Sequence, residues 1–400
     1  MINARPRVIV YNDLADLSGG AERGAADLLL HLQRRLETSF ASHATGALAD
    51  GLAAAGLAVH HLQGPPTLHL PRHTLYQQPG RVVGFARALQ EAGRALAAHV
   101  REQDAALLYT FSLKGHLVSL AAAAHHEARA VWDLRELAVP DVVLAPLLLR
   151  ARGSVDRLLV QTADAARRVA RWFPAERVVH APNGVDVPVL APDTRARVRD
   201  RLGIAPDVFL LLHAGRQCAD KGLDVLLAAM HEIGPAVLVA CGAPRTTHDV
   251  RFAAQCARAA APLGDRVRLL GERHDVAALL AAADLAVVPA RADQQSRFLL
   301  EALATGTPAV ATALPGAIEV VEPPTAGLVV PPGDARALAR AIETLRTDAA
   351  RRASMGAVGR DRVARLFSRE QSVTARAALL EAVVLAPRPG GTRSMAVEVG

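Results

Sequence analysis

A strand that ends in glycine and is followed by two cations carries the clearest chemical signal in this sequence. Gly215 and Arg216 close the run Leu211–Arg216, and Lys221 follows five positions later, where a helix is expected to begin. Fixed cations beside a helix N-terminus attract anions, because the exposed backbone N–H groups and the helix dipole add to their charge. The loop is therefore predicted to bind a diphosphate, with solvated loop charges as the alternative.

Lysine is almost absent from this chain. Among 46 lysine and arginine residues only Lys114 and Lys221 are lysine. A compact ammonium on a flexible stem is not replaced by a planar guanidinium without a change of geometry, so a retained lysine indicates a specific role. Lys221 is accordingly predicted to be functional. Lys114 follows an expected strand at 106–111, and either a ligand contact or an ordinary charge at a helix start accounts for it.

Two carboxylates form a second candidate site. Asp293 lies in a loop after an expected strand, and Glu301 follows eight positions later on an apolar helix, a spacing of about two helical turns. Carboxylate oxygens accept hydrogen bonds from the paired hydroxyls of a ribose or a pyranose. The pair is predicted to contact one sugar-bearing ligand, while helix capping is the alternative for Asp293 and for Ser296.

A third candidate, Ser18-Gly19-Gly20, follows the first expected strand and opens the first expected helix. Two glycines allow a ligand to approach the backbone closely at a helix N-terminus. A glycine turn needs no ligand, so the signal gains weight only from its expected place across a cleft from residues 216–221.

Composition describes a globular chain with room for two domains. The 400 residues have a mass of 42.1 kDa, 51% are apolar and 21% are charged, which is too long for one ordinary core and too apolar for a disordered chain. The net charge is +7, but basic and acidic residues are interspersed. Aromatic residues make up only 3%, too few for a base-stacking surface, so nucleic acid is excluded as a partner.

Cysteine usage and the absence of targeting signals favour the cytoplasm. Cys218, Cys241 and Cys256 form no C-x-x-C pair, which favours a reducing compartment. No signal peptide precedes the first expected strand, and no run reaches about 18 apolar residues.

Short apolar runs alternate with helical periods from end to end, a pattern typical of an α/β fold with parallel sheets. The sequence predicts two Rossmann-like domains that face a cleft, with ligands at the carboxyl ends of the strands. Residues 1–186 form the first domain, 187–206 a linker without regular structure, 207–361 the second domain and 387–400 a disordered tail. The predicted strands span 8–11, 106–111, 130–134 and 158–161, then 209–213, 236–241, 267–270, 285–289, 308–312 and 328–330.

In order and spacing, these motifs together resemble the family-four glycosyltransferases, a retaining group with the GT-B architecture. The resemblance covers nearly the whole chain and rests on the following residues: Gly19-Gly20, Asn183-Gly184-Val185-Asp186, Gly215-Arg216 with Lys221-Gly222, Leu270-Gly271-Glu272-Arg273 with Asp275, Leu279–Asp284, Leu300-Glu301-Ala302, Gly306-Thr307-Pro308 and Gly327–Asp334.

The resemblance implies a nucleotide-sugar donor in the second domain and an acceptor in the first. Arg216 and Lys221 would hold the diphosphate, Glu301 the ribose and Asp293 the transferred sugar, with Gly20 near the donor phosphate. A helix at about 362–384, near Ser368, would cross back to the first domain. The donor-binding set implied in this way also includes Gly19, Gly215, Arg273, Ser296, Arg297 and Leu300. No metal or other cofactor is expected, because no spaced cluster of metal ligands accompanies these motifs.

Two departures from the family pattern bear on the site. The family's paired motif opens with glutamate, glycine and an aromatic residue, whereas this chain has Asp293-Gln294-Gln295, which leaves open a different sugar or a shifted contact. Many relatives also end the strand at 130–134 with a histidine, whereas this chain offers Asp133, Arg135 and Glu136. Arg135 could support the leaving phosphate and Asp133 the acceptor hydroxyl, or the two could form a salt bridge at the strand end.

The leading hypothesis is a retaining, hexosyl-type glycosyltransferase in cell-envelope, exopolysaccharide or glycoconjugate synthesis, acting on a glycan or a lipid-linked acceptor. A non-catalytic relative that binds a nucleotide or a partner in a polysaccharide assembly complex is the alternative, and a sugar epimerase or phosphorylase ranks below it. The acceptor site is expected around Pro65–Pro79.

A peripheral contact with the inner face of a membrane is left open. Arg81, Arg87 and Arg94 accompany Val83 and Phe85 on one predicted helix. These residues would make a basic amphipathic face, and a helix with one buried and one solvated face is the alternative.

Overall fold

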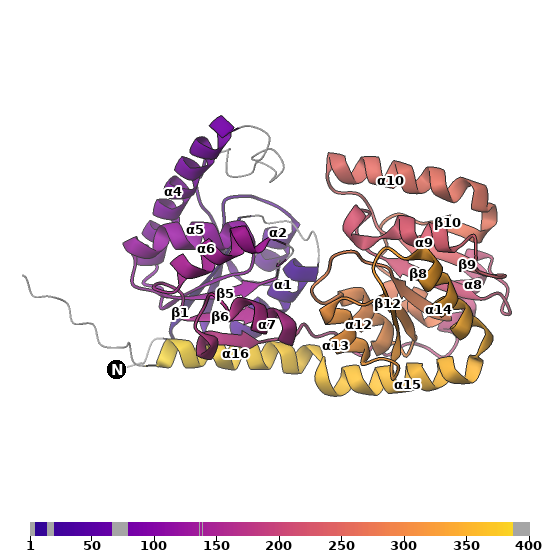
Figure 1. Ribbon diagram of the computed structural model, residues 1–400. Helices are drawn as coiled ribbons and strands as arrows, with labels where there is room; N and C mark the ends of the chain where they lie inside the picture. The colour runs from indigo at the N-terminus through magenta and orange to yellow at the C-terminus, as the bar shows by residue number, and fades with distance from the viewer. Residues whose placement is uncertain (1–4, 14–19, 66–78, 136, 138, 387–400) are drawn as a thin grey trace, which may run out of the picture.

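The computed structural model describes residues 5–13, 20–65, 79–135, 137 and 139–386, and shows two α/β domains side by side (Figure 1). Each domain is built on one fully parallel sheet. Gly19, Glu136, most of the expected acceptor loop at 65–79 and the tail at 387–400 lie outside the described residues.

The first sheet has seven strands in the order β3-β2-β1-β4-β5-β6-β7. Successive residues of β1 face opposite sides, so that Val8 and Val10 pack under α1, α2 and α16 while Ile9 and Tyr11 pack under α4 and α5. The strands are β1 (Arg7–Asn12), β2 (Glu37–Ser42), β3 (Ala58–His61), β4 (Leu107–Thr110), β5 (Arg129–Leu134), β6 (Arg157–Val160) and β7 (Val178–His180). The helices are α1 (Gly20–Leu32), α2 (Ala47–Ala54), α4 (Pro79–Glu102), α5 (Leu113–Ala122), α6 (Asp141–Ala151) and α7 (Ala163–Val169).

The second sheet has six strands in the order β10-β9-β8-β11-β12-β13, and the sequence predicted all six. Leu210 and Leu212 of β8 face one core, whereas Leu211 faces the other, under α9, α10 and α14. The strands are β8 (Leu210–Ala214), β9 (Val237–Cys241), β10 (Val267–Leu269), β11 (Leu285–Val288), β12 (Ala309–Thr312) and β13 (Gly327–Val330). The helices are α8 (Thr194–Leu202), α9 (Leu223–Ala229), α10 (Thr247–Ala260), α11 (Val276–Ala282), α12 (Arg297–Ala304), α13 (Pro315–Val321), α14 (Ala335–Thr347) and α15 (Ala349–Leu366).

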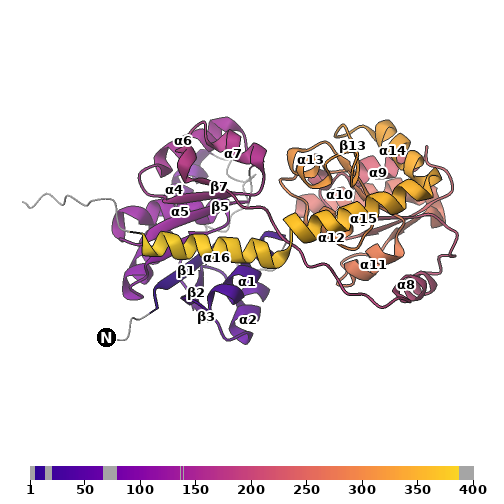
Figure 2. The same ribbon diagram turned by 90° about the horizontal axis from the view of Figure 1, so that it is seen from below.

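The chain returns to the first domain through two helices, where the sequence suggested one crossing helix at about 362–384. Figure 2 shows α15 along the second domain and α16 (Arg369–Leu385) along the first. The break occurs at Ser368, which forms a parallel bridge with Val185 and caps α16 by accepting a hydrogen bond from the Gln371 amide at 3.2 Å. The Val185 amide donates to the Phe367 carbonyl, and the Val185 carbonyl accepts from the Arg369 amide. Because these two groups are already hydrogen-bonded to Val185, they do not continue α15.

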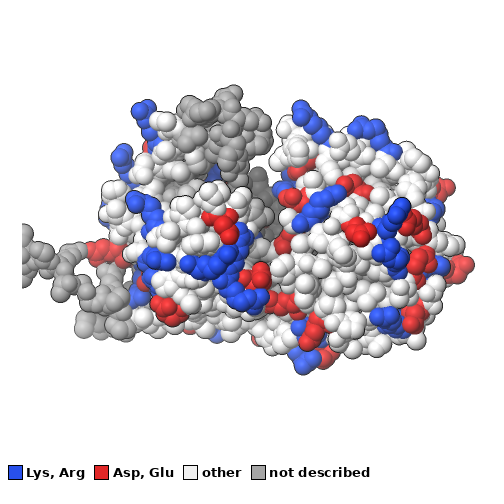
Figure 3. All heavy atoms as spheres, in the orientation of Figure 1, with Lys and Arg blue, Asp and Glu red and all other residues white. Residues whose placement is uncertain are grey.

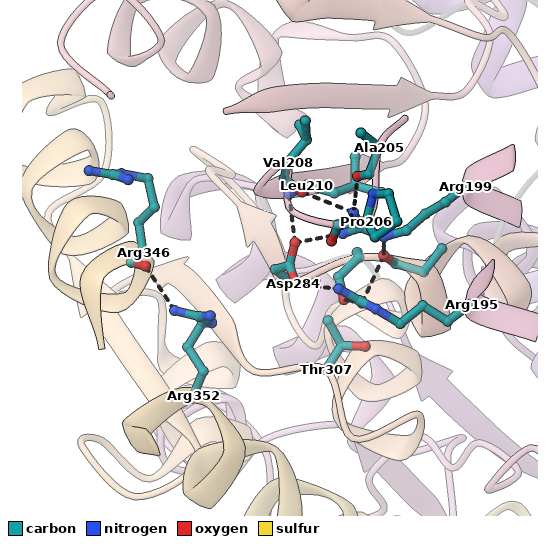
Figure 4. A network of polar contacts seen from close by, with 12 residues as sticks. Arg195, Arg199, Ala205, Pro206, Val208, Leu210, Asp284, Thr307, Arg346 and Arg352 are labelled. Carbon is teal, nitrogen blue, oxygen red and sulfur yellow. Dashed lines mark hydrogen bonds and ion pairs between the residues drawn. The ribbon is translucent and has the colours of Figure 1, made fainter. Parts of the chain in front are cut away.

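The predicted linker at 187–206 contains a helix, α8, that is docked on the second domain. Asp284 accepts from Arg195 at 2.6 Å and from Arg199 at 2.7 Å, and it also binds the Leu210 amide at 2.7 Å (Figure 4). The buried guanidinium of Arg199 further donates to the carbonyls of Ala282, Ala205 and Val208. Val198 and Leu202 also pack on the core of the second domain, but the helix has few other apolar residues, which is why apolar periodicity did not reveal it.

The helix considered for membrane contact, α4, is buried along its second half. Ala92, Leu96 and Val100 lie in the core, whereas Val83 in its first half is 57% exposed. Arg87 and Arg94 are exposed. Within the described segments no helix combines the length and the apolar character needed to span a bilayer.

Candidate functional site

Loops at the carboxyl ends of both sheets line two adjoining cavities between the domains. Figure 3 shows the cleft between the two domains. A cavity of about 420 Å³ is lined by the loops after β8, β9 and β11, and by Arg135, Gln161 and Asn183 of the first domain. A larger cavity of about 1270 Å³ adjoins it, since Arg135, Arg216 and Asp293 line both. Most of the predicted site residues within the described chain line the smaller cavity.

The loop after β8 lies against neighbouring backbone, which only glycine permits. A Cβ atom on Gly242, which has a φ of 132°, would come within 1.8 Å of the Gly215 carbonyl oxygen. A Cβ atom on Gly222, with a φ of 69°, would come within 1.9 Å of the Pro289 carbonyl oxygen. The chain therefore passes between Gly215 and Gly222 close to the ends of β9 and β11, and this path places Arg216 and Lys221 on the cavity wall.

The structure brings Lys221 and Asp293 into direct contact. The Lys221 Nζ atom donates to Asp293 Oδ2 at 2.5 Å, although 72 positions separate the two residues. Arg216 is nearly half exposed, with its Nε atom 3.8 Å from Asp249 Oδ2. The residue predicted to bind the diphosphate, Lys221, and the residue predicted to bind the sugar, Asp293, are thus neighbours. Together they place one positive and one negative group at the same point of the cavity wall.

Around α12 the predicted residues divide into two groups. Arg297 and Glu301 are paired at 3.0 Å and line the cavity. Ser296 also lines it, but its hydroxyl caps α12 by accepting from the Leu299 amide at 3.3 Å, as the capping alternative predicted. Leu300 does not reach the cavity. Its side chain is fully buried in the core of the second domain.

Arg273 lines the cavity at its rim. Two hydrogen bonds of 2.8 and 2.7 Å join its guanidinium to Asp275, which also accepts from Arg201 at 2.6 Å. Gly20 is the first residue of α1, and Glu22 in the first turn of that helix lines the larger cavity.

Asp133 is not at the cavity surface, in contrast to the role considered for it with an acceptor. Its side chain is 0% exposed and lines neither cavity. It accepts from the Tyr109 hydroxyl at 2.6 Å, Arg135 Nε at 2.8 Å and Gln161 Nε2 at 2.7 Å, with Arg376 Nε at 3.7 Å. Asp133 therefore orients Arg135, whose side chain lines both cavities.

The charge of Asp133 is maintained in spite of its burial. Burial raises the pKa of a carboxyl group, but the guanidinium groups of Arg135 and Arg376 and the Tyr109 hydroxyl outweigh it, so the pKa of Asp133 lies below its usual value. The carboxylate is ionised at neutral pH and acts only as an acceptor.

Lys114 lies beside the larger cavity rather than the smaller one. Its Nζ atom is 3.9 Å from Asp13 Oδ2, and the Ser112 hydroxyl donates to the other oxygen of Asp13 at 2.6 Å. Four residues at or just after the carboxyl ends of β1 and β4 line this cavity together: Asn12, Asp13, Ser112 and Lys114.

His213, at the end of β8, is a site residue that the sequence reading did not single out. Its Nδ1 atom is 3.0 Å from the Val287 carbonyl oxygen, its ring meets Phe298 edge to face, and it lines the smaller cavity. Burial lowers the pKa of His213 to about 4, so the ring is neutral at pH 7. Because a carbonyl only accepts, we assign the proton to Nδ1, which leaves Nε2 as an acceptor. Its place in the Leu211–Arg216 motif was the available signal.

The domains also contact each other beside the cleft. Glu319 of α13 is 2.9 Å from His180 Nε2 and accepts from the Ala163 amide at 2.9 Å, where α7 begins. The Asn183 amide donates to Gln295 Oε1 at 2.6 Å. These bonds join the end of the first domain to the loops of the second.

The His180–Glu319 contact is expected to make the stability of the closed arrangement pH-dependent. The hydrogen bond to Glu319 raises the pKa of His180, and contacts with His180 and the Ala163 amide hold the pKa of Glu319 below its usual value against the effect of burial. The stabilisation from His180 is present below its unfolded pKa of about 6.5 and is lost as pH rises through its raised folded pKa. The stabilisation from Glu319 is lost only as pH falls through its lowered folded pKa.

A comparison of the wild type with Glu319→Gln therefore tests the contact. The difference in Tm is expected to be largest near pH 6 and to shrink by pH 9. Glu232→Gln, which removes an exposed ion pair with Arg336, should show no such pH dependence. A Glu319→Gln difference that stays constant from pH 6 to pH 9 would contradict the prediction.

Within the part of the chain that the structure describes, no three His, Cys, Asp or Glu side chains form a group suited to a metal ion.

Comparison with known proteins agrees with this geometry. The family model described as "Glycosyl transferases group 1" matches residues 208–348, which span the second sheet and the candidate donor residues. The match is confined to the second domain. The matched range contains Arg216, Lys221, Asp293 and Glu301.

Curated relatives carry glycosyltransferase names. A D-inositol 3-phosphate glycosyltransferase of Geodermatophilus obscurus is 36% identical over 237 residues, which cover 55% of this chain and 51% of the relative. A GDP-mannose-dependent monoacylated alpha-(1-6)-phosphatidylinositol monomannoside mannosyltransferase of Corynebacterium glutamicum is 34% identical over 200 residues, or 46% of this chain and 51% of the relative. The chain spans about half the length of the curated relatives it matches.

Solved structures show the same fold over nearly the whole chain. HepE of Anabaena, in complex with UDP and glucose, superposes with a TM-score of 0.79 at 21% identity, covering 94% of this chain and 99% of HepE. Sucrose-phosphate synthase of Thermosynechococcus elongatus also gives 0.79, at 22% identity, covering 95% and 99%. The two domains therefore form a GT-B fold, as predicted.

Proposed function

We propose that this protein transfers a sugar from a nucleoside diphosphate to an acceptor, with retention of the anomeric configuration. The observation that carries the proposal is the single cavity lined by Arg216, Lys221, Asp293 and Glu301 at the ends of parallel strands. The names of the relatives support it, since one is GDP-mannose-dependent and one similar structure holds UDP and glucose.

The charges on the cavity wall suit this chemistry. Cleavage of the bond between a sugar and a diphosphate leaves negative charge on the departing phosphate, which fixed cations stabilise most where water is excluded. Arg216 and Lys221 take this role, with Arg135 facing them from the first domain. Glu301 binds the ribose hydroxyls and Asp293 the transferred sugar. No step is assigned to a metal ion.

The acceptor is placed in the larger cavity, toward the first domain. Asp13, Ser112 and Lys114 line its far wall, and the volume of about 1270 Å³ leaves room for a glycan or the head of a lipid-linked acceptor. Relatives named for inositol phosphate and phosphatidylinositol mannoside acceptors support a place in cell-envelope or glycoconjugate synthesis. Such an acceptor would be met in the cytoplasm or at the inner face of the membrane.

A donor panel tests the function. The Tm is measured with UDP-, GDP- and ADP-linked hexoses at about 100 times Kd, where a bound ligand stabilises the fold by about 2.7 kcal/mol. One donor series is expected to raise the Tm and to be hydrolysed slowly or transferred. If a donor binds but is neither hydrolysed nor transferred to any envelope acceptor, a non-catalytic role replaces this proposal, and if no donor binds, both are wrong.

A further inference from the structure

An arginine lies within the apolar stripe that docks α16 on the first domain. The buried residues of this helix are Val373, Arg376, Ala377, Leu380 and Val383, and among them only Arg376 is charged. Its side chain is buried, with 4% of the residue exposed. An apolar residue at this position would pack in the same place without the cost of taking a guanidinium out of water. The arginine therefore calls for an explanation beyond packing.

Two donors of the Arg376 guanidinium hold the chain segment that follows β7. The Nη1 atom donates to the Pro182 carbonyl at 2.9 Å, and the Nη2 atom donates to the Ala181 carbonyl at 2.5 Å. The next residue, Asn183, lines the smaller cavity and donates its backbone amide to Gln295 of the second domain. Arg376 therefore fixes the backbone just before the chain reaches the cavity.

The Nε atom of the same guanidinium lies near the carboxylate that holds Arg135. Arg376 Nε is 3.7 Å from Asp133 Oδ2, and Arg135 Nε donates to that oxygen at 2.8 Å. Arg376 Nε makes no hydrogen bond within the described residues, so its contact with Asp133 is one of charge. One carboxylate oxygen thus attracts two guanidinium groups, one from α16 and one from the cavity wall.

The position of Arg135 depends on where Asp133 is held. The Arg135 side chain is 5% exposed and has its Nη2 atom 2.8 Å from Asp133 Oδ2. The helix α1 limits it as well, because a Cβ atom on Gly24 would come within 2.6 Å of Arg135 Nη1. Arg135 lines both cavities, whereas Arg376 lines neither. Any effect of Arg376 on the site must therefore pass through its neighbours.

We infer that Arg376 is a positioning residue for sugar transfer, which holds Asp133, and through it Arg135, in register with the chain segment at 181–183. The inference rests on the proposed function, because it takes Arg135 to stabilise the charge of the departing phosphate. Displacement of a catalytic group by about 1 Å can lower a rate by about 10²-fold. Arg376 thus controls the rate of transfer without touching the substrate.

The test is a double-mutant cycle between Arg376 and Arg135. Arg376→Met removes the guanidinium and leaves an apolar side chain on the docking stripe, and Arg135→Met removes the group through which Arg376 acts. Arg376→Lys is the conservative variant, since an ammonium keeps the charge but not the planar fork that reaches two carbonyls and Asp133. With the donor found in the panel, kcat and KM are measured for each variant below the Tm of the least stable one.

The cycle is expected to be strongly non-additive. Arg376→Met should lower kcat by about 10- to 100-fold, and Arg135→Met by about 10²-fold or more. The double variant should have a kcat within about threefold of that of Arg135→Met alone, because the two residues act as a unit. The KM for the donor should stay within about threefold in Arg376→Met, since the second domain is proposed to hold the nucleotide. Arg376→Lys should recover only part of the loss.

Arg129→Met is the matched control. Arg129 also ties α16 to the first domain, since its Nη2 atom donates to the Ala386 carbonyl at 2.7 Å and its Nη1 atom to Asp156 at 3.2 Å. It lines neither cavity. The change loosens the end of α16 without touching Asp133, so kcat should stay within about twofold of the wild type. An equal loss of kcat in Arg129→Met and Arg376→Met would overturn the inference, because loosened docking alone would then account for both.

The cycle also distinguishes the inference from the proposed function. If the losses of the two single variants multiply in the double variant, Arg376 does not act through Arg135, and the inference is wrong while the proposed function stands. The same conclusion follows if Arg376→Met or Arg135→Met retains the wild-type kcat. If Arg376→Met does not fold, Arg376→Lys takes its place in the cycle. If the wild type transfers no sugar from any donor, both the inference and the proposed function are wrong.

Discussion

Replacing Lys221 with methionine is expected to lower kcat for sugar transfer by about 10²- to 10³-fold, the usual effect of removing one preplaced group that stabilises transition-state charge. The change removes the ammonium 2.5 Å from Asp293, and with it a cation that would balance the charge of the departing diphosphate. Lys221→Arg should recover little of the loss, because the planar guanidinium cannot take the position of a compact ammonium beside Asp293. Steady-state kinetics with the donor found in the panel gives kcat and KM separately.

Arg291→Gln supplies the matched control. Arg291 pairs with Asp224 through two bonds of 2.7 Å near the same loops, but it lines neither cavity. Its kcat should stay within about twofold of the wild type, since exposed ion pairs contribute little. A Lys221→Met protein that is folded and retains wild-type kcat would remove Lys221 from the mechanism.

Asp133→Asn is expected to destabilise the first domain by about 3–5 kcal/mol, the cost of removing one partner from a buried ion pair. The change leaves the guanidinium groups of Arg135 and Arg376 buried near an uncharged amide. It also loosens Arg135, so activity should fall in the fraction that remains folded. Tryptophan fluorescence during urea unfolding isolates this domain, because both tryptophans of the chain, Trp132 and Trp172, lie in it.

Glu37→Gln is the control for this measurement. Glu37 pairs with Arg7 in the same domain, but both side chains are exposed, so the loss should be below about 1 kcal/mol. Equal urea midpoints for Asp133→Asn and the wild type would show that the buried charges contribute no stability.

Apolar runs predicted all six strands of the second sheet and four strands of the first, β1, β4, β5 and β6, because strands of parallel sheets are commonly buried on both faces. They did not predict β2, whose residues Glu37–Ser42 include polar side chains, or the short β3 and β7. β3 and β7 are the edges of the first sheet, and none of their residues is fully buried. The helix α8 was missed because its apolar contacts are few, made by Val198 and Leu202. Its other contacts, from Arg195 and Arg199 to Asp284, join residues far apart in the sequence.

Motif spacing predicted which residues would line the cavity of the second domain, because each followed a strand whose position was clear. It could not show that Lys221 and Asp293 touch, since no local pattern encodes a contact across 72 positions. The role of Asp133 was open between ligand contact and salt bridge, and burial decided it. No sequence pattern indicated a role for Arg376, because its contact with Asp133 arises only where α16 docks on the first domain.

The return of α16 to the first domain also has a consequence for synthesis on the ribosome. The sheet of the first domain and then the whole second domain are translated before Arg376 exists. Throughout that time the carboxylate of Asp133 can be matched by Arg135 but not by Arg376. The first domain is therefore the first to be synthesised but the last to be completed. It can be completed only after the second domain has emerged from the ribosome.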